Sequence, residues 1–381
     1  MKKVLLVALV LTMVVGGYLA FTTVDTKVSV ATAAKQTYAG TTYVAGMGGH
    51  FTKANFTIDP NNADDPIKMG ALDRIVIGDK TSHPTHDARI DSEDANILFW
   101  STYVLDANKK QHVGKTDLKT GKVIFDKAMD PDPRSKGEKP PVYCASGQSK
   151  ANYLPIFMGN EGYVDVFDKK TMDHKKRIFV DGLGYKAGSY VFVHGTNSND
   201  MKKFLISMTM KGDDGKANGA IDFILVDLPA MEKGEWKVLA KATHKGEPGK
   251  TITFRMYFSP DDKLIFQSAA DRFWLLDAKD LKMVDEKMTK GQNHDAQPTP
   301  DGKYAILTLR TSDTDGCDIE GKPIMKDGAP VKITDGTIQI YDVDAKKIIG
   351  KQASVCFGCH KGMGLGDKSA VLCGLDTTFK K

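Results

Sequence analysis

An all-β fold made of repeated antiparallel sheets is predicted for this chain of 381 residues. Two short phrases recur along it: an apolar strand that ends in Asp before a polar turn, and a strand followed by a Pro-Asp turn. Successive copies of the first phrase lie about 50 to 65 residues apart, and repeats of this length that contain only short strands are typical of β-propellers. The sequence therefore predicts a β-propeller.

The amino-terminal segment, residues 1–33, has the pattern of a secretory signal. Residues 1–3 are Met-Lys-Lys, residues 4–21 are almost entirely apolar, and small residues follow up to Ala34. Cleavage after Ala33 fits the preference for small residues at signal cleavage sites. An uncleaved single-span anchor is the alternative, because the apolar run ends well before Ala33. In both cases we expect the body of the chain to be exported, to the periplasm or another extracytoplasmic site of a bacterium.

Composition indicates an ordinary globular body over residues 38–381, which we predict to be a single propeller domain. The chain is 41% hydrophobic and 27% charged, and no second apolar stretch is long enough to cross a bilayer. The net charge of +5 is spread through alternating lysines and aspartates, which excludes a dedicated nucleic-acid surface. A mild basic excess of this kind is compatible with docking of an acidic redox partner.

The first repeated phrase predicts a strand, a tight turn and a second strand. Its aspartates are expected to accept hydrogen bonds from backbone amides of the turn, which is a structural role. They are Asp117, Asp168, Asp227, Asp277 and Asp342.

The second phrase marks the inner strand of each predicted blade. Ser259-Pro260-Asp261 and Thr299-Pro300-Asp301 are its clearest turns, because Pro fixes the first turn position. Inner strands are expected near His86, Tyr143, Val193, Arg255, His294 and His360. This spacing predicts six or seven blades. The last blade would begin with residues 356–381 and be completed by residues 38–79, so that strands from both ends of the chain close the propeller in one sheet.

These phrases resemble the propellers of the YVTN and cytochrome d1 type, over roughly residues 72–350. The resemblance implies the propeller fold. Because d1-type propellers hold a tetrapyrrole with channel histidines, it also implies room for a noncovalent second cofactor. Copper or another metal that prefers imidazole is an alternative ligand of such histidines.

The run Cys356-Phe357-Gly358-Cys359-His360 is a CxxCH motif, the pattern of c-type haem attachment. Two thiols at this spacing add to the vinyl groups of haem, and the adjacent imidazole becomes the proximal iron ligand. A structural disulfide or half of a zinc site are the alternatives. Only 21 residues follow His360, too few for a separate cytochrome domain, so one covalent haem c would be carried on the propeller itself.

A distal iron ligand is expected from another blade. The candidates are His50, His86, His194 and His294, of which His86 and His294 both begin a His-Asp-Ala run. The alternative for each is a histidine that satisfies backbone groups at a strand start. Met363 is too near His360 along the chain to reach the opposite face of the iron. The remaining histidines, His83, His112, His174 and His244, are predicted to be solvated, and pairing among Cys144, Cys317 and Cys373 stays open.

Two functions are consistent with this pattern. The first is an exported c-type cytochrome on a propeller scaffold that transfers electrons to or from a partner protein through Cys356, Cys359 and His360. The second is a propeller oxidoreductase or cofactor-binding protein that holds a d1-like haem, a metal or a small substrate in its central channel. Motifs of nucleotide binding, serine hydrolysis and zinc proteolysis are missing from the sequence.

Overall fold

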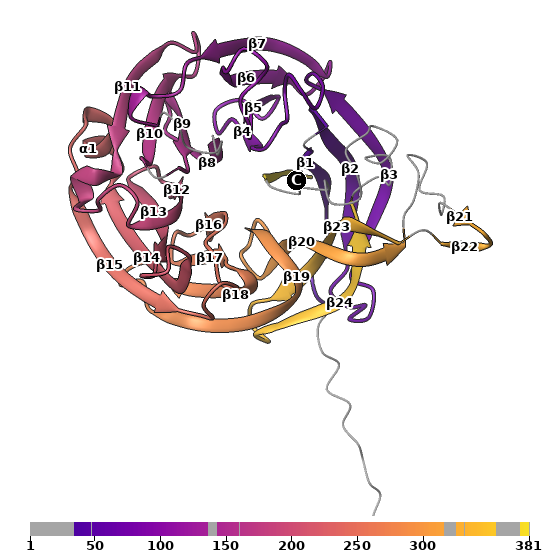
Figure 1. The fold of residues 1–381 in the computed structure, drawn as a ribbon. Coiled ribbons are helices and arrows are strands. Elements are labelled where there is room, and N and C mark those ends of the chain that lie inside the picture. The colour runs from indigo at the N-terminus through magenta and orange to yellow at the C-terminus, as the bar shows by residue number, and fades with distance from the viewer. Residues whose placement is uncertain are drawn as a thin grey trace, which may run out of the picture. The chain divides into compact units, whose positions relative to one another are not determined.

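A computed structural model describes residues 34–46, 48–135, 143–159, 161–315, 325–330, 332–355 and 374–380. Lys35–Lys381 form one compact unit, and of the unit that precedes it only Ala34 is described. In the described part of Lys35–Lys381, antiparallel sheets are arranged about a common axis in the manner of a β-propeller (Figure 1). The predicted all-β, propeller-type architecture is confirmed.

Four of the sheets contain four strands each, and neighbouring strands in each sheet are hydrogen-bonded. The first sheet has the order β25 (Leu375–Phe379), β1 (Tyr38–Gly46), β2 (His50–Ile58), β3 (Ile67–Val76). The second is β4 (Arg89–Ile90), β5 (Ile97–Ser101), β6 (Gln111–Asp117), β7 (Lys122–Met129). The third is β8 (Tyr143–Gln148), β9 (Asn152–Phe157), β10 (Tyr163–Asp168), β11 (His174–Phe179). The fourth is β12 (Tyr190–Asn197), β13 (Lys203–Lys211), β14 (Ala217–Asp227), β15 (Val238–Lys245).

A seven-stranded sheet follows. Its order is β16 (Met256–Phe258), β17 (Leu264–Ser268), β18 (Ala270–Asp277), β19 (Met283–Pro298), β20 (Tyr304–Asp315), β23 (Lys332–Asp342), β24 (Lys347–Ser354). The remaining elements are a small hairpin, β21 (Met325–Lys326) with β22 (Ala329–Pro330), the 3-10 turns Pro133–Ser135 and Val180–Leu183, and helix α1 (Leu228–Lys233). In the long strand β19, Met283 to Met288 pair with β18 while Gln292 to Pro298 pair with β20.

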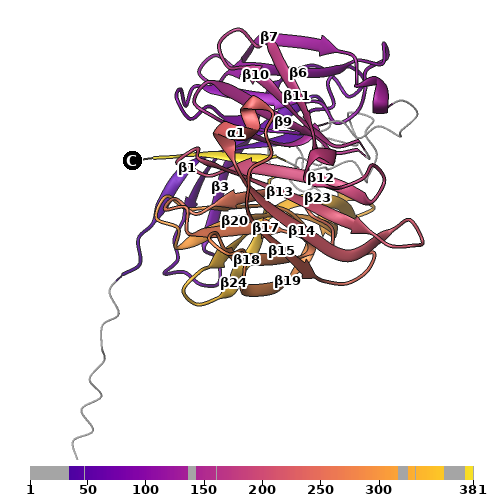
Figure 2. The same ribbon diagram turned by 90° about the vertical axis from the view of Figure 1, so that its left-hand side faces the viewer.

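Strands from near the two ends of the chain lie in one sheet. β25 pairs with β1 from Leu375 opposite Val44 to Phe379 opposite Gly40, and Figure 2 shows β25 between the sheets on either side of it. The sequence predicts an inner strand near His360 for this sheet; the described strand begins at Leu375, within the predicted residues 356–381. A short strand after a glycine carries no periodic signal from which its start could be predicted. His360 lies outside the described residues.

The turn aspartates have the structural role that the sequence predicts. Asp117 accepts hydrogen bonds from the amides of Lys119 and Thr120, and Asp168 does the same for the two residues at the equivalent turn positions. Each aspartate thus fixes the reversal between the third and fourth strand of its repeat.

The apolar core is divided into clusters, most of which lie between two neighbouring sheets, while one lies within the seven-stranded sheet. Trp100 belongs to the cluster between the first two sheets, and Trp274 to the cluster between the fourth sheet and the seven-stranded sheet. A further cluster joins Ile338 and Ile340 of β23 to Phe56 of β2, so the last sheet packs on the first. Burial of each such side chain contributes about 1.5 to 3 kcal/mol.

Within the described residues, no helix has the length and apolar character needed to span a bilayer.

Candidate functional site at the inner strands

The innermost strands bring the residues at their amino-terminal sides together. We call the group of His86, Cys144, His194 and His294, with the aromatic rings of Tyr103 and Phe254, the histidine cluster. His86 precedes β4, Cys144 is the second residue of β8, and the other two histidines lie in β12 and β19. These elements belong to four different repeats, so the fold and not sequence proximity forms the cluster.

Contacts in the histidine cluster run from ring to ring. His194 Nε2 lies 2.9 Å from Cys144 Sγ, and the His194 ring meets the edge of Phe254 with centroids 6.0 Å apart. Phe254 stacks on His294 at 4.1 Å. His86 packs on Tyr103 at 4.2 Å. All three imidazoles are buried, with at most 3% of each residue exposed.

Burial keeps two of these imidazoles neutral. It lowers the pKa of His194 to about 3, with a smaller contribution from the nearby His86, and it lowers the pKa of His294 well below its usual value. Among the described residues, Nδ1 of His194 and Nδ1 of His294 have no hydrogen-bond partner. Neutral imidazoles with an unoccupied ring nitrogen are the form in which histidine binds metal ions and haem iron.

His86 has the orientation most typical of an iron or metal ligand. Its Nδ1 lies 3.2 Å from the carbonyl oxygen of Tyr143. A neutral imidazole that donates from Nδ1 to this carbonyl carries its lone pair on Nε2. Ligating histidines are commonly held in this way, with the second ring nitrogen bonded to a backbone carbonyl or a carboxylate.

A layer of buried charge lies next to the histidine cluster. Arg255 forms ion pairs with Asp87 at 2.5 Å and with Asp295 at 3.4 Å, and all three side chains are at most 1% exposed. The two aspartates are those of the His-Asp-Ala runs, so this repeated phrase supplies both a cluster histidine and a carboxylate of the layer. Tyr153 donates a hydrogen bond to Asp87, and Thr308 donates one to Asp295.

Gly374 passes against this charged layer just before β25. Its φ is +100°, and an added Cβ would lie 2.8 Å from both the amide nitrogen of Ala88 and a guanidinium nitrogen of Arg255. Only glycine fits this position without displacing its neighbours. Gly374, the first described residue after the segment 356–373, is therefore fixed beside Asp87 and Arg255.

A polar pocket of about 330 Å³ lies at the opposite ends of the inner strands. Its lining includes Arg89, Gln148, Asn197, Gln297 and Asp376. Burial raises the pKa of Asp376, which favours its neutral form. The charged layer of Arg255 lies between this pocket and the histidine cluster. Along the chain, Asp87 stands between His86 and the pocket residue Arg89, and Asp295 stands between His294 and the pocket residue Gln297.

Three of the four predicted distal candidates, His86, His194 and His294, are brought together. His50 is not: it begins β2, the third strand of its sheet, and lines a separate surface pocket of about 430 Å³ with Arg74. Burial lowers the pKa of His50 to about 4, with a further contribution from Arg74. The motif residues Cys356, Cys359 and His360 lie outside the described residues, as do Met363, Cys317 and Cys373.

Sequence reasoning missed two features. Cys144 belongs to the histidine cluster, and the signal for it was its place at the start of an inner strand, equivalent to that of His194. The prediction that His83 and His112 are solvated is wrong: both imidazoles bond to Asp126, and His112 is buried. Their polar sequence surroundings gave no indication of this pairing, because Asp126 lies in the strand that follows.

Similarity to other proteins is weak. No protein-family model matches the chain, and no curated protein sequence matches it. Among solved structures, TolB from Acinetobacter baumannii aligns at 13% identity with a TM-score of 0.48, over 83% of this chain and 64% of that one. Kuenenia stuttgartiensis hydrazine synthase aligns at 19% identity with a TM-score of 0.42, over 72% of this chain and 68% of that one. The chain thus spans less than two thirds of the TolB chain, and similarity at this level carries no conclusion about function.

Proposed function

We propose that this protein is an exported, bacterial c-type cytochrome on a propeller scaffold, with one haem attached to Cys356 and Cys359 and His360 as the proximal iron ligand. The observation that carries the proposal is the CxxCH motif in a chain that begins with a signal-like segment. Covalently bound haem c supplies one-electron transfer. A redox partner protein and a periplasmic location belong to the same proposal.

The described residues on both sides of the motif support a haem near the histidine cluster. Gly374 lies beside Asp87. On the other side, the amide of Val355 donates a hydrogen bond to the carbonyl of Gly336. Gly336 lies opposite Arg310 on the neighbouring strand, and Arg310 lies opposite Gln292 on the strand after that. Gln292 in turn bonds to the His294 ring. Three strand spacings correspond to about 14 Å, so Val355, the last described residue before the motif, lies at about this distance from Gln292.

Among the predicted distal candidates we favour His86. Its hydrogen bond from Nδ1 to the Tyr143 carbonyl leaves the lone pair of Nε2 available to the iron. By contrast, His194 Nε2 is hydrogen-bonded to Cys144, and His294 Nε2 is hydrogen-bonded to Gln292. His194 and His294 could bind only through Nδ1, the more hindered ring nitrogen. His50 is disfavoured because it lies in the third strand of its sheet.

We further propose that the propeller has six blades and is closed. The division of β19 between β18 and β20 supports counting the seven-stranded sheet as two blades that share this strand. Pairing of β25 with β1 and the packing of Ile340 near Phe56 support closure between the last blade and the first.

The experiment is expression of the full-length chain together with a haem c maturation system, followed by a pyridine haemochrome spectrum of the denatured protein. We expect one haem per chain in the wild type and loss of most haem after Cys359→Ser. His86→Gln should leave covalent haem in place. In the absorption spectrum of the native protein, it should convert low-spin haem to high-spin haem that binds carbon monoxide when reduced. His50→Gln is the matched control and should keep the wild-type spectrum. Equal spectra for all variants would contradict the assignment of His86.

A second function is favoured by the pocket of about 330 Å³ at the far ends of the inner strands. Arg89 and the four amide side chains there suit a small polar substrate, whose oxidation or reduction would make the protein an oxidoreductase. A d1-like haem or metal bound by Nδ1 of His194 and His294 is the corresponding cofactor. Extraction of the purified protein, followed by absorption spectroscopy and metal analysis of the extract, tests this second function. A noncovalent tetrapyrrole or a stoichiometric metal that is lost in His194→Gln would support it. An extract that contains neither a tetrapyrrole nor a metal would argue against it.

A further inference from the structure

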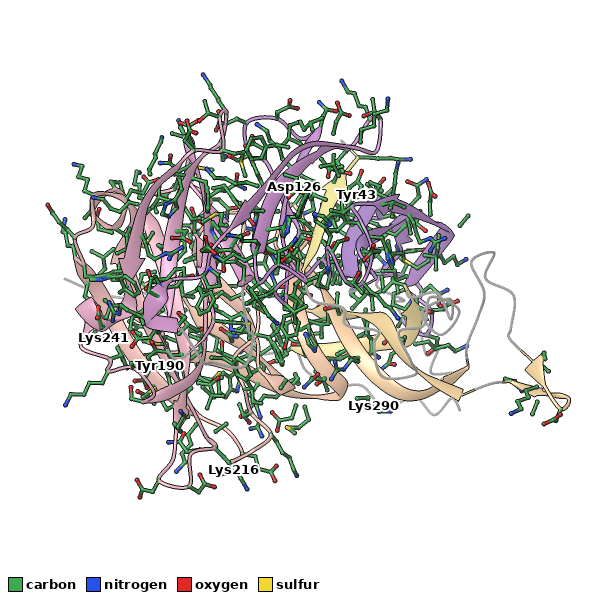
Figure 3. All side chains as sticks on the ribbon, turned by 45° about the horizontal axis from the view of Figure 1, so that its top comes forward. Tyr43, Asp126, Tyr190, Lys216, Lys241 and Lys290 are labelled. Atoms are coloured by element: carbon green, nitrogen blue, oxygen red, sulfur yellow. The ribbon has the colours of Figure 1, made fainter. Side chains whose placement is uncertain are left out.

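We propose a divalent metal site, selective for Zn²⁺ or a similar ion that prefers nitrogen and oxygen ligands, formed by His83, His112 and Asp126. It lies on the outer strands of the second sheet and is independent of the haem proposal. His112 belongs to β6 and Asp126 to β7, where Figure 3 labels it, while His83 lies in the connection between β3 and β4. One ligand atom from each of the three side chains lies within 4.8 Å of the other two.

The distances show three donors already directed at one point. His112 Nδ1 is 2.8 Å from Asp126 Oδ1, and His83 Nε2 is 2.9 Å from Asp126 Oδ2. The two imidazoles meet edge to face with their centroids 4.5 Å apart. In a tetrahedral zinc site with bonds of about 2.0 to 2.1 Å, ligand atoms lie about 3.3 Å apart. For each imidazole nitrogen, the distance to its carboxylate oxygen needs to increase by only about 0.5 Å to admit the ion.

The second ring nitrogen of His112 gives an independent reason to assign a ligand role. His112 Nε2 faces Asp106 Oδ2 at 3.4 Å. A carboxylate behind the distal nitrogen of a ligating histidine fixes the ring and increases its basicity, and this arrangement is common at zinc sites. Asp106 is thus a positioning residue, and its side chain is 12% exposed compared with 9% for that of His112.

Turn geometry holds His83 in place. Asp79 accepts hydrogen bonds from the amides of Thr81 and Ser82, which fixes the loop. Gly78 leaves room for the ring, because a Cβ at this residue would lie 2.4 Å from His83 Nδ1. The His83 ring also meets the edge of Trp100 at 5.7 Å. The imidazole is therefore positioned by the backbone before any ion binds, which lowers the entropic cost of binding.

Solvent can reach the site. The Asp126 side chain is 35% exposed and that of His83 is 15% exposed, so an ion can enter past the carboxylate. Three protein ligands leave the fourth position of a tetrahedral ion for water. On binding, each imidazole keeps one proton on its other ring nitrogen, Nε2 of His112 facing Asp106 and Nδ1 of His83, and any second proton is released to solvent. His83 Nε2 and His112 Nδ1 then donate their lone pairs to the metal. Affinity should consequently fall as the pH is lowered.

Isothermal titration of the tag-free full-length chain with ZnCl₂ tests the site. Asp126→Asn and His112→Gln should each lower the affinity of one zinc equivalent at least 100-fold, and Asp106→Asn should lower it about 10- to 100-fold. His174→Gln is the matched control, because His174 bonds a carboxylate, Asp165, without a second imidazole, and it should bind as the wild type does.

X-ray absorption of the zinc-loaded protein supplies a readout that a structural role would not change. We expect a first shell of nitrogen and oxygen only. Sulfur in the first shell would place the ion at cysteines and overturn the proposal, as would equal zinc binding by the wild type and Asp126→Asn. Should His112→Gln fail to fold, zinc binding by Asp126→Asn and Asp106→Asn tests the site instead. Both variants replace one oxygen of a part-exposed side chain by nitrogen and are therefore expected to fold.

Discussion

The two groups of histidines in this protein have opposite surroundings. In the histidine cluster, His194 and His294 contact Cys144 and Phe254, and burial lowers the pKa of both imidazoles. On the outer strands, His112 faces Asp126, whose hydrogen bond raises the pKa of the imidazole against the effect of burial. The inner group is held neutral by apolar contacts, whereas the outer group is held by carboxylates.

This difference indicates different uses. Neutral, buried imidazoles packed on apolar groups suit an iron that changes oxidation state, because the surrounding apolar groups and solvent exclusion set its potential. Imidazoles on a shared carboxylate suit a redox-inactive cation, whose charge the carboxylate offsets. The same residue type thus serves two proposed sites, and the sequence around each histidine does not distinguish them.

The largest expected effect is at the charged layer beside the inner group. Arg255→Met would leave Asp87 and Asp295 buried without their cation, which we expect to lower the free energy of unfolding by about 3 to 5 kcal/mol. Arg134 also bonds two carboxylates but its side chain is 42% exposed, so Arg134→Met should cost about 1 kcal/mol or less. Urea denaturation measures both. Similar decreases in the free energy of unfolding for the two variants would show that the charged layer is accessible to water.

An intermediate effect concerns pH. Because the pKa of His194 falls from about 6.5 in the unfolded chain to about 3 when folded, the unfolded state binds more protons below pH 6.5, and stability is lost as the pH falls through this range. Between pH 6.5 and 5 this histidine alone accounts for about 2 kcal/mol. His194→Gln should therefore lose about 2 kcal/mol less than the wild type over this interval in urea denaturation.

The outer group supplies the contrast. The raised pKa of His112 means that its stabilisation is complete below pH 6.5 and is lost as the pH rises through the folded value. In metal-free protein, His112→Gln should accordingly flatten the stability curve above pH 6.5, and below pH 6.5 it should lower the free energy of unfolding by a constant amount without changing the slope. Parallel curves for His112→Gln and His194→Gln would remove the distinction between the two groups.

The smallest expected effect is that of Asp126→Asn on stability. In metal-free protein the part-exposed carboxylate should contribute about 1 kcal/mol or less. With saturating ZnCl₂ the wild type should gain thermal stability and the variant should not. Differential scanning calorimetry with and without zinc checks this, and an equal zinc-induced shift in both proteins would contradict a role for Asp126 as ligand.

The sequence predicted the propeller architecture because local signals repeat: the turn aspartates accept hydrogen bonds from amides two or three residues away, as Asp117 does from both. It also identified His86, His194 and His294 as candidate ligands, and the fold brings these three side chains together. It did not predict the start of β25, the place of His50 or the pairing of His83 with Asp126. These depend on contacts between distant segments, such as the 43 residues between His83 and Asp126, for which single-residue patterns carry no signal.

Covalent haem is the central claim, and mass spectrometry of the denatured, reduced chain tests it most directly. After expression with a haem c maturation system, the account predicts that the intact wild-type chain carries the added mass of one haem, that peptide mapping places this mass on the fragment containing Cys356 and Cys359, and that Cys359→Ser lacks the doubly attached form. A wild-type chain with the unmodified mass, obtained from cells in which another c-type cytochrome matures normally, would contradict the account.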